Sequence, residues 1–140
     1  MLGFLSDIFE EFDDLAEKNQ VDKVKTIGDA YIICAGALSP ARPDDAVRVV
    51  RMGLEMQEVV KRTAAREGID IAVRIGVHTG RCTGGIIGTV KIHFDMWGGA
   101  MAGAIRMEES GAKGKARRAV TCTQLVLTTA RRSGLMALRA

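Results

Sequence analysis

Residues 21–35 read VDKVKTIGDAYIICA and contain two short β-branched and apolar runs, 21–27 and 30–35, on either side of Gly28 and Asp29. Runs of this kind that flank a glycine and an aspartate are typical of a β-hairpin with a tight turn. We therefore predict two antiparallel strands here. The turn places Asp29 at the tip of the hairpin, where its carboxylate can project past the edge of the sheet.

Two amphipathic helices are predicted on either side of this hairpin. In residues 4–19, apolar side chains recur every three or four positions and acidic side chains fill the opposite face. Beyond the hairpin, two prolines mark a loop, and Asp44 or Asp45 is a suitable N-cap for a helix over residues 45–67. Gly68 is expected to end that helix.

A strand, a glycine-rich stretch and a third helix follow. Over residues 69–78, β-branched side chains alternate strictly with other residues, which is the pattern of a strand with one face in the core. A helix is predicted over 98–109 and a further strand over 115–127. This order of elements predicts an α+β fold, a ferredoxin-like antiparallel sheet with helices packed on one face.

The composition limits the class of protein. A chain of 140 residues with 47% apolar and 26% charged side chains fits one compact globular domain. Only 4% of residues are aromatic, so a surface that stacks nucleic acid bases is not expected. Cys34, Cys82 and Cys122 are widely spaced, which supports neither a disulfide framework nor a zinc site. The uncharged stretches are shorter than the roughly 20 residues that span a membrane, and no secretory signal is recognised, so we expect a cytoplasmic protein.

Charge divides the chain into two parts. Residues 113–140 hold seven of the 20 basic side chains and none of the 17 acidic ones. We therefore predict a folded domain over residues 1–112 and a basic C-terminal segment over 113–140. A solvated chain end is the commoner interpretation of such a segment, and attraction of a polyanion is the alternative.

Several motifs resemble those of the class III nucleotide cyclases, the catalytic domains of adenylate and guanylate cyclases. Residues 23–31 (KVKTIGDAY) are similar to the family signature KxKTIGDAY, and residues 74–80 (RIGVHTG) to its RIGIHTG motif. Residues 95–98 (DMWG) and 106–111 (RMEESG) resemble its DxWG and RMExxG motifs in the same order. The resemblance covers residues 1–112. It implies the fold of that family and its reaction, in which ATP gives cyclic AMP and pyrophosphate.

The resemblance also implies roles for individual residues. Asp29 matches the second of two aspartates that bind Mg²⁺ or Mn²⁺, and the family's first aspartate lies on a strand that precedes the helix at residues 4–19, so that it is missing from this chain. Arg106 matches the arginine that stabilises the transition state, and a guanidinium suits phosphoryl oxygens. Lys25 and Asp95 match the residues that contact the purine base.

The chemistry of Lys25 and Asp95 favours ATP over GTP. Adenine presents an acceptor at N1 and a donor at N6, whereas guanine presents a donor at N1 and an acceptor at O6. A lysine can donate and an aspartate can accept, so the pair complements adenine, and guanylate cyclases of the family carry glutamate at the position of Lys25. Arg74 is a further candidate ligand for the substrate phosphates, with a salt bridge to a nearby acid such as Asp70 as an equally good alternative.

Each of these residues also has an ordinary structural explanation. Lys25 fits a solvated edge-strand lysine, Asp95 a turn residue and Arg106 a helix-surface arginine. The resemblance nevertheless implies a head-to-tail dimer, or pairing with another cyclase chain, in which one chain supplies the metal aspartates and the other the base-reading and transition-state residues.

Two departures from the family pattern bear on activity. Ala102 stands where the family has an asparagine that orients the ribose, and loss of one preorganised polar group commonly lowers a rate about 10²- to 10³-fold. Residues 116–140 do not match the family's C-terminal pattern, which is compatible with truncation or an altered reading frame. We therefore expect this fragment to be weak or inactive alone. The alternatives are a catalytically silent module that binds nucleotide or dimerises, and a nucleic-acid-binding sheet, for which Tyr31 is the only aromatic residue on the hairpin.

Overall fold

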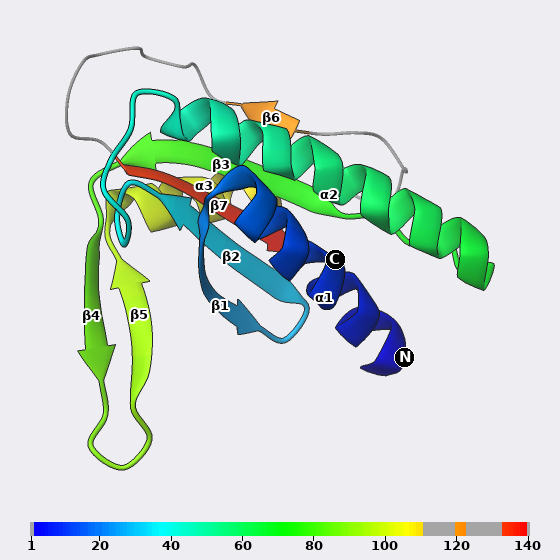
Figure 1. Cartoon of the computed structure of the whole chain (residues 1–140), viewed down its shortest axis with the longest axis horizontal. Helices are drawn as coiled ribbons and strands as arrows, with labels where there is room; N and C mark the ends of the chain where they lie inside the picture. Colours follow the sequence, from blue (N-terminus) through cyan, green and yellow to red (C-terminus); the bar gives the residue numbers. More distant parts are fainter. Residues whose placement is uncertain (1, 111–119, 123–132, 140) are drawn as a thin grey trace.

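A computed structural model of the chain describes residues 2–110, 120–122 and 133–139 (Figure 1). Its helices are α1 (Leu2–Asn19), α2 (Asp45–Glu67) and α3 (Gly99–Glu109). Its strands are β1 (Asp22–Ile27), β2 (Ala30–Ala35), β3 (Arg74–Gly80), β4 (Thr83–Ile87), β5 (His93–Trp97), β6 (Val120–Cys122) and β7 (Ser133–Arg139).

Five strands form one sheet in the order β1-β2-β7-β3-β6, and β4 and β5 form a separate two-stranded sheet. Neighbours in the large sheet are antiparallel, except that β3 and β6 are parallel. β7 lies between β2 and β3 and pairs with both. The predicted fold class, an α+β arrangement built on an antiparallel sheet, is confirmed.

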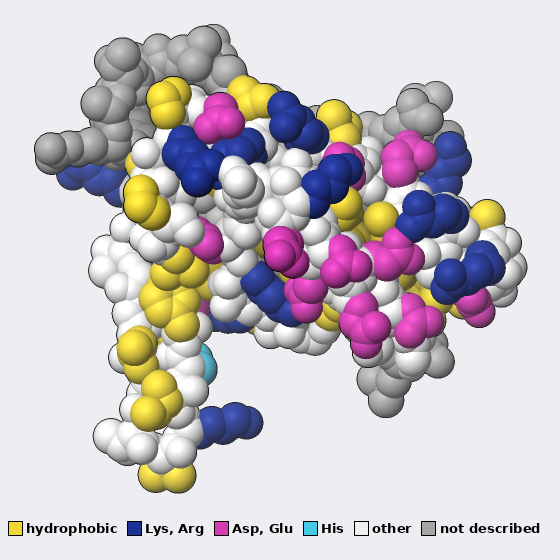
Figure 2. All heavy atoms as spheres, viewed as in Figure 1, with side chains coloured by type: hydrophobic (Ala, Val, Ile, Leu, Met, Phe, Trp, Pro, Cys, Tyr) yellow, Lys and Arg dark blue, Asp and Glu magenta, His cyan; other side chains and the backbone are white. Residues whose placement is uncertain are grey.

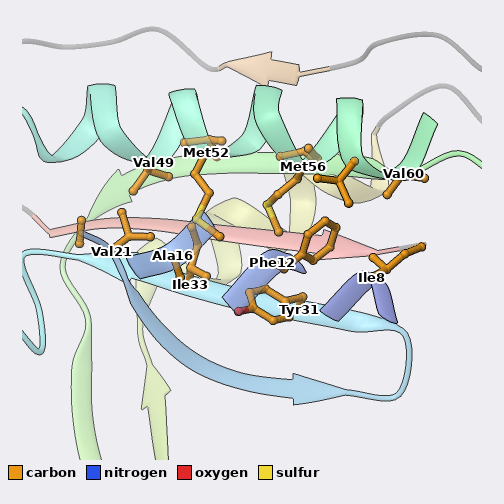
Figure 3. Packing of buried hydrophobic residues seen from close by; sticks show 14 residues of the cluster. Ile8, Phe12, Ala16, Val21, Tyr31, Ile33, Val49, Met52, Met56 and Val60 are labelled. Atoms are coloured by element: carbon orange, nitrogen blue, oxygen red, sulfur yellow. The ribbon is translucent and has the colours of Figure 1, made fainter. Parts of the chain in front are cut away.

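α1 and α2 cover one face of the large sheet and enclose the main hydrophobic core (Figures 1 and 3). Tyr31 and Ile33 of β2 project to this face, because alternate side chains of a strand point to the same side. They share the core with Phe12 of α1 and with Met52 and Met56 of α2, all fully buried. The rings of Phe12 and Tyr31 meet edge to face with centroids 5.3 Å apart, which fixes α1 over the hairpin.

α3 covers the opposite face of the sheet, although the sequence analysis expected all helices on one side. Ile32 and Cys34, the intervening residues of β2, are buried there in a second cluster with Met96 of β5 and with Ala100 and Ala104 of α3. A strand that is buried on both faces needs cover on both. The apolar run at residues 30–35 is that kind of strand, so the two faces of β2 explain why the helices lie on two sides.

Element boundaries agree with the sequence predictions over the first half of the chain. The hairpin and α2 lie where expected, and Gly68 ends α2 in the left-handed conformation with φ of 66°. The strand predicted over 69–78 instead begins at Arg74 and ends at Gly80, the residues that face the two ends of β7. Strand limits are thus set by the neighbouring strand, whereas the alternation over 69–78 records which side chains face the core.

Only part of the C-terminal region is described. Of the strand predicted over 115–127, β6 is described, and the remainder of that range lies outside the described residues. The division into a domain over 1–112 and a basic segment over 113–140 stays a prediction.

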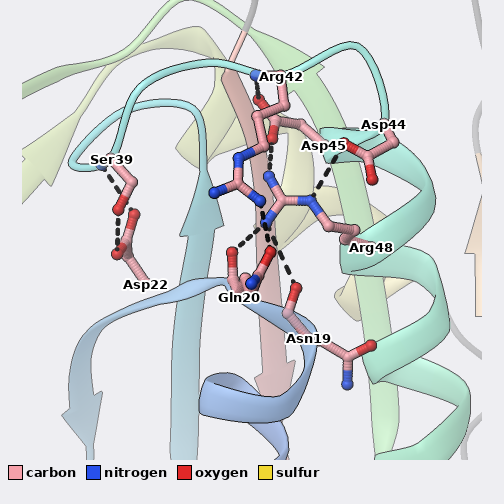
Figure 4. A network of polar contacts seen from close by, with 8 residues as sticks. All are labelled: Asn19, Gln20, Asp22, Ser39, Arg42, Asp44, Asp45 and Arg48. Atoms are coloured by element: carbon pink, nitrogen blue, oxygen red, sulfur yellow. Dashed lines mark hydrogen bonds and ion pairs between the residues drawn. The ribbon is translucent and has the colours of Figure 1, made fainter.

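A buried arginine ties α2 to the segment that leads into β1 (Figure 4). Arg48 is 6% exposed, pairs with Asp45, and donates to the backbone carbonyls of residues 19 and 20. Beside it, the amide and hydroxyl of Ser39 donate to the carboxylate of Asp22 at 2.9 and 2.8 Å. These contacts hold the start of β1, the strand that carries Lys25.

Candidate functional site

The structure brings Lys25 and Asp95 into direct contact, although they are 70 residues apart in the chain. Nζ of Lys25 on β1 lies 2.5 Å from Oδ1 of Asp95 on β5, and the two side chains are 27% and 15% exposed. The backbone amide of Met96 also donates to Asp95 Oδ1, at 2.7 Å. A cationic donor and an anionic acceptor therefore meet at a partly buried place on the surface.

The hairpin turn accounts for the direction of Lys25. Ile27 pairs with Ala30 across the turn, and Lys25 then pairs with Ile32. Directly opposed residues of antiparallel strands lie on the same face of the sheet. Ile32 belongs to the cluster under α3, so Lys25 lies on the face toward β5 and α3 rather than on the face covered by α1.

The ion pair favours the ionised form of Asp95. The hydrogen bond from Lys25 lowers the pKa of this carboxyl below its usual value, burial opposes the shift, and the Met96 amide adds to it. Since an ionised carboxylate accepts hydrogen bonds only, Asp95 is an acceptor at neutral pH and Lys25 is its matching donor.

Arg74 pairs with a residue that the sequence analysis did not consider. Its Nη2 and Nε lie 2.7 and 2.8 Å from Oε1 of Glu108, and the Glu108 side chain is only 5% exposed. The alternative interpretation of Arg74, a salt bridge to a nearby acid such as Asp70, is thus met by a different acid. The signal for Glu108 lay in its helical spacing, because Glu108 is four residues after the buried Ala104 and therefore faces β3.

Arg106 lies on the exposed side of α3, and its Nε donates to the carbonyl of Ala102 at 3.3 Å. α3 begins at Gly99 and β5 ends at Trp97, so Gly98 alone connects the helix that carries Arg106 to the strand that carries Asp95. The structure thus joins Lys25 to Asp95, pairs Arg74 with Glu108 and leaves the guanidinium of Arg106 on the surface of the adjoining helix.

Asp29 occupies the tip of the hairpin, as predicted, next to Gly28 with φ of 58°. Its carboxylate is a hard oxygen donor of the kind that Mg²⁺ and Mn²⁺ take, so it fits one position in such a site. Within residues 2–110, 120–122 and 133–139, no three His, Cys, Asp or Glu side chains gather as a metal site. Among the residues that the structure describes, Asp29 is therefore the ligand that the sequence predicts for a metal.

Two further observations concern the rest of the surface. A cavity of about 440 Å³ lies between α2 and residues 69–73, and the described residues that line it include none of the predicted site residues. None of the helices in the described part of the chain is both long and apolar enough to span a membrane.

Comparison with known proteins identifies the family. The family described as the adenylate and guanylate cyclase catalytic domain matches residues 1–135. Adenylate cyclase type 9 of Xenopus laevis is 37% identical over 115 residues, which are 82% of this chain and 9% of that protein. The chain spans less than a third of the length of the curated relatives.

Two solved structures share the fold. One is the catalytic core of a rhodopsin-guanylyl cyclase with converted specificity in complex with ATPalphaS, with a TM-score of 0.69 and 36% identity over 79% of this chain and 59% of that one. The other is a non-canonical dimeric guanylyl cyclase domain of the RhoGC fusion protein from Blastocladiella emersonii, with a TM-score of 0.68 and 31% identity over 79% of this chain and 61% of that one. With the cyclase motifs, the sheet and the family match in agreement, the chain belongs to the adenylate and guanylate cyclase catalytic domain family.

Proposed function

We propose that this chain is an adenylate cyclase-type domain that binds ATP for conversion to cyclic AMP and pyrophosphate. The contact between Lys25 and Asp95 carries the proposal, because it sets a donor beside an acceptor at a partly buried site. Adenine offers N1 to the lysine and N6 to the carboxylate, and an entering base would exchange the ion pair for one contact to each group. The function belongs to intracellular signalling, in the cytoplasmic setting expected from the sequence.

The choice of ATP over GTP depends on the order of these two groups. Guanine reverses donor and acceptor at the same ring positions, so a base held in one orientation by Lys25 and Asp95 can satisfy both groups only as adenine. The family includes enzymes of both kinds, and the donor at position 25 is what favours adenine here.

The remaining residues are assigned to the triphosphate. In the reaction the ribose 3′-oxygen attacks the α-phosphorus and pyrophosphate leaves. Asp29 would hold a divalent cation, Mg²⁺ or Mn²⁺, which would neutralise charge on the triphosphate. Arg106 would bind the phosphoryl oxygens as negative charge builds there. Contact of Arg74 with phosphate remains a prediction, and it would fall to the Nη1 group, because Nε and Nη2 are bound to the buried Glu108.

A complete site is proposed to need two chains, arranged head to tail, or this chain paired with another cyclase. The metal aspartates would come from one chain, and Lys25, Asp95 and Arg106 from the other. Since Ala102 offers no polar side chain to the ribose, we expect weak turnover or none from this fragment alone. A catalytically silent nucleotide-binding or dimerisation module is the alternative.

Nucleotide binding tests the proposal directly. Displacement of a fluorescent ATP analogue from the purified chain should show tighter binding of ATP than of GTP. Lys25→Met and Asp95→Asn should each weaken ATP binding at least about tenfold, the effect of losing a charge-assisted hydrogen bond. Lys61→Met is the matched control, because Lys61 is an exposed lysine of α2 that lies 4.0 Å from Glu58, a residue of the same helix. Equal binding of the two nucleotides would contradict the choice of base.

Cyclic AMP formation separates an enzyme from a silent module. The chain should be assayed with Mn²⁺ and ATP, alone and mixed with a complete class III adenylate cyclase that carries defective base-reading residues. Cyclic AMP from the mixture supports the paired site. ATP binding with no cyclic AMP in either assay supports the silent nucleotide-binding module. A chain that binds neither nucleotide contradicts both the cyclase and the nucleotide-binding module and leaves the dimerisation module.

A further inference from the structure

β1 carries two lysines that point to opposite faces of the sheet, although they are two residues apart. In a regular strand, residues i and i+2 lie on the same face. Here the pairing with β2 shifts between Lys23 and Lys25, so that Lys23 is opposite Ile33, Lys25 is opposite Ile32, and Val24 is the extra residue of a β-bulge. The bulge therefore separates the two lysines.

The hairpin turn shows which lysine is displaced. The pairs nearest the turn, from Ile27–Ala30 to Lys25–Ile32, would be the same in a strand without the bulge. In such a strand Val24 would then lie opposite Ile33. Lys23 would lie on the same face as Lys25, next to the candidate base site. The direction of Lys25 is thus the same with or without the bulge. What the bulge changes is Lys23, which leaves the candidate base site for the face covered by α1.

A strand without the bulge would gain two favourable contacts. It would bury Val24 beside Ile33 in the main core and would give Lys23 a nearby carboxylate in Asp95. In the bulged strand, Val24 instead packs against the cluster under α3, and Lys23 needs another partner. The contacts of Lys23 on the face of α1 must therefore stabilise the bulge.

Asp13 of α1 and Tyr31 of β2 provide those contacts. Lys23 Nζ lies 2.7 and 2.9 Å from the two carboxylate oxygens of Asp13 and 5.0 Å from the centroid of the Tyr31 ring. Tyr31 is completely buried, and its hydroxyl donates to Asp13. Burial raises the pKa of Asp13, but the hydrogen bonds from Lys23 and Tyr31 outweigh it and the net shift is downward. Asp13 is accordingly an anion that binds Lys23 at neutral pH.

We propose that Asp13, oriented by Tyr31, is a positioning residue that keeps Lys23 away from the base site and so leaves Lys25 as the lysine that binds Asp95. A second ammonium on that face would compete with Lys25 for the carboxylate that the base needs. The contact of Asp22 with Ser39 holds the start of β1 in the same bulged register. The inference rests on the proposed function of Lys25 and Asp95, but the register of β1 can be tested without nucleotide.

The test removes Asp13 and then removes the lysine that it restrains. Asp13→Asn should release Lys23 toward Asp95, and the pKa of Asp95, followed by carbon-13 NMR, should fall further because a second cation favours the ionised carboxyl. ATP binding should weaken about fivefold, the scale of one half-exposed ion pair. Adding Lys23→Met should restore both values, because methionine cannot compete for a carboxylate. A loss of stability alone would not be reversed by this second change.

The control variants are followed by the same two measurements, the pKa of Asp95 and the affinity for ATP. Glu55→Gln of α2 removes the partner of Lys18, a lysine of α1 that lies 2.7 Å away, and should change neither the Asp95 pKa nor ATP binding. If Asp13→Asn does not fold, Tyr31→Phe keeps the ring and should shift Asp95 in the same direction by less. An unchanged Asp95 pKa, or no restoration by Lys23→Met, would overturn the inference. If the expected Asp95 pKa pattern is seen in a chain that does not bind ATP, the proposed function fails and the inference stands.

Discussion

At the scale of single residues, two glycines of β3 show how closely α3 approaches the sheet. A Cβ atom on Gly76 would lie 2.1 Å from the carbonyl oxygen of Ala104 and 2.4 Å from the backbone nitrogen of Glu108. Both neighbours are backbone atoms, so only a movement of α3 could make room. Gly80, at the end of the same strand, would meet Ala100 at an ordinary 3.6 Å.

Gly76→Ala should therefore destabilise the chain by about 1–3 kcal/mol, the usual cost of overpacking. Gly80→Ala should change the free energy of unfolding by well under that amount. Urea denaturation of the two variants measures the difference. In Gly76→Ala the Arg74–Glu108 pair should also be disturbed, because Glu108 is on the displaced part of α3. Equal stability of both variants would show that α3 is free to move away from β3.

At the scale of elements, the joint between α2 and β1 depends on one buried ion pair (Figure 4). The side chains of Arg48 and Asp45 are 7% and 6% exposed, and Arg48 also donates to backbone carbonyls at the end of α1. Breaking a buried pair leaves an uncompensated charge, which costs about 3–5 kcal/mol. We expect a loss of stability on this scale for Arg48→Met.

Thermal and urea unfolding check this prediction against two further variants. Arg51→Met alters an exposed arginine of the same helix and should change stability little. The double variant Arg48→Met with Asp45→Asn should lose less than the two single losses added together, because neither charge is then left alone. Strict additivity would mean that the two residues stabilise the joint independently.

Sequence patterns predict well the elements whose formation depends on residues close together in the chain. The hairpin depends on two short runs and Gly28, and the end of α2 depends on Gly68, so both were predicted correctly. The start of β3 at Arg74 and the pairing of β7 between β2 and β3 depend on contacts between distant segments, which a local pattern does not contain. The β-bulge at Val24 belongs with these, because α1 provides the contacts that support it.

The candidate site also has features that the sequence predicts and features that depend on packing. The cyclase motifs implied that Lys25 and Asp95 act together, and the structure places them in contact. The partner of Arg74 is Glu108, which the packing of α3 on β3 brings close to it. Asp70 was the example chosen from the sequence because it is near Arg74 in the chain. Roles of Asp29 and Arg106 stay predictions that depend on nucleotide and metal.

At the scale of the whole molecule, the β4–β5 arm (residues 83–97) extends away from the body of the protein (Figure 1). Hydrophobic side chains lie along this arm in Figure 2. Among the residues of the arm, Ile86, Val90 and Ile92 are 74%, 100% and 68% exposed. An isolated two-stranded hairpin is marginally stable in water, and a contiguous apolar surface usually marks an interface. A second copy of the chain is one of the two partners that we propose for the two-chain site, the other being a different cyclase chain.

We therefore expect the arm to contribute to self-association. Replacing Ile86 and Ile92 by threonine keeps the preference for strands and removes most of the apolar surface, so the dissociation constant measured by sedimentation equilibrium should rise at least about tenfold. Val47→Gln with Leu54→Gln is the matched control, since both residues are 51% exposed but lie on α2. If the arm variant and the control associate as tightly as the unmodified chain, the arm does not form the interface. If only the arm variant dissociates, its ATP binding as a monomer should persist, because Lys25 and Asp95 come from one chain, whereas any cyclic AMP formation should be lost with the dimer.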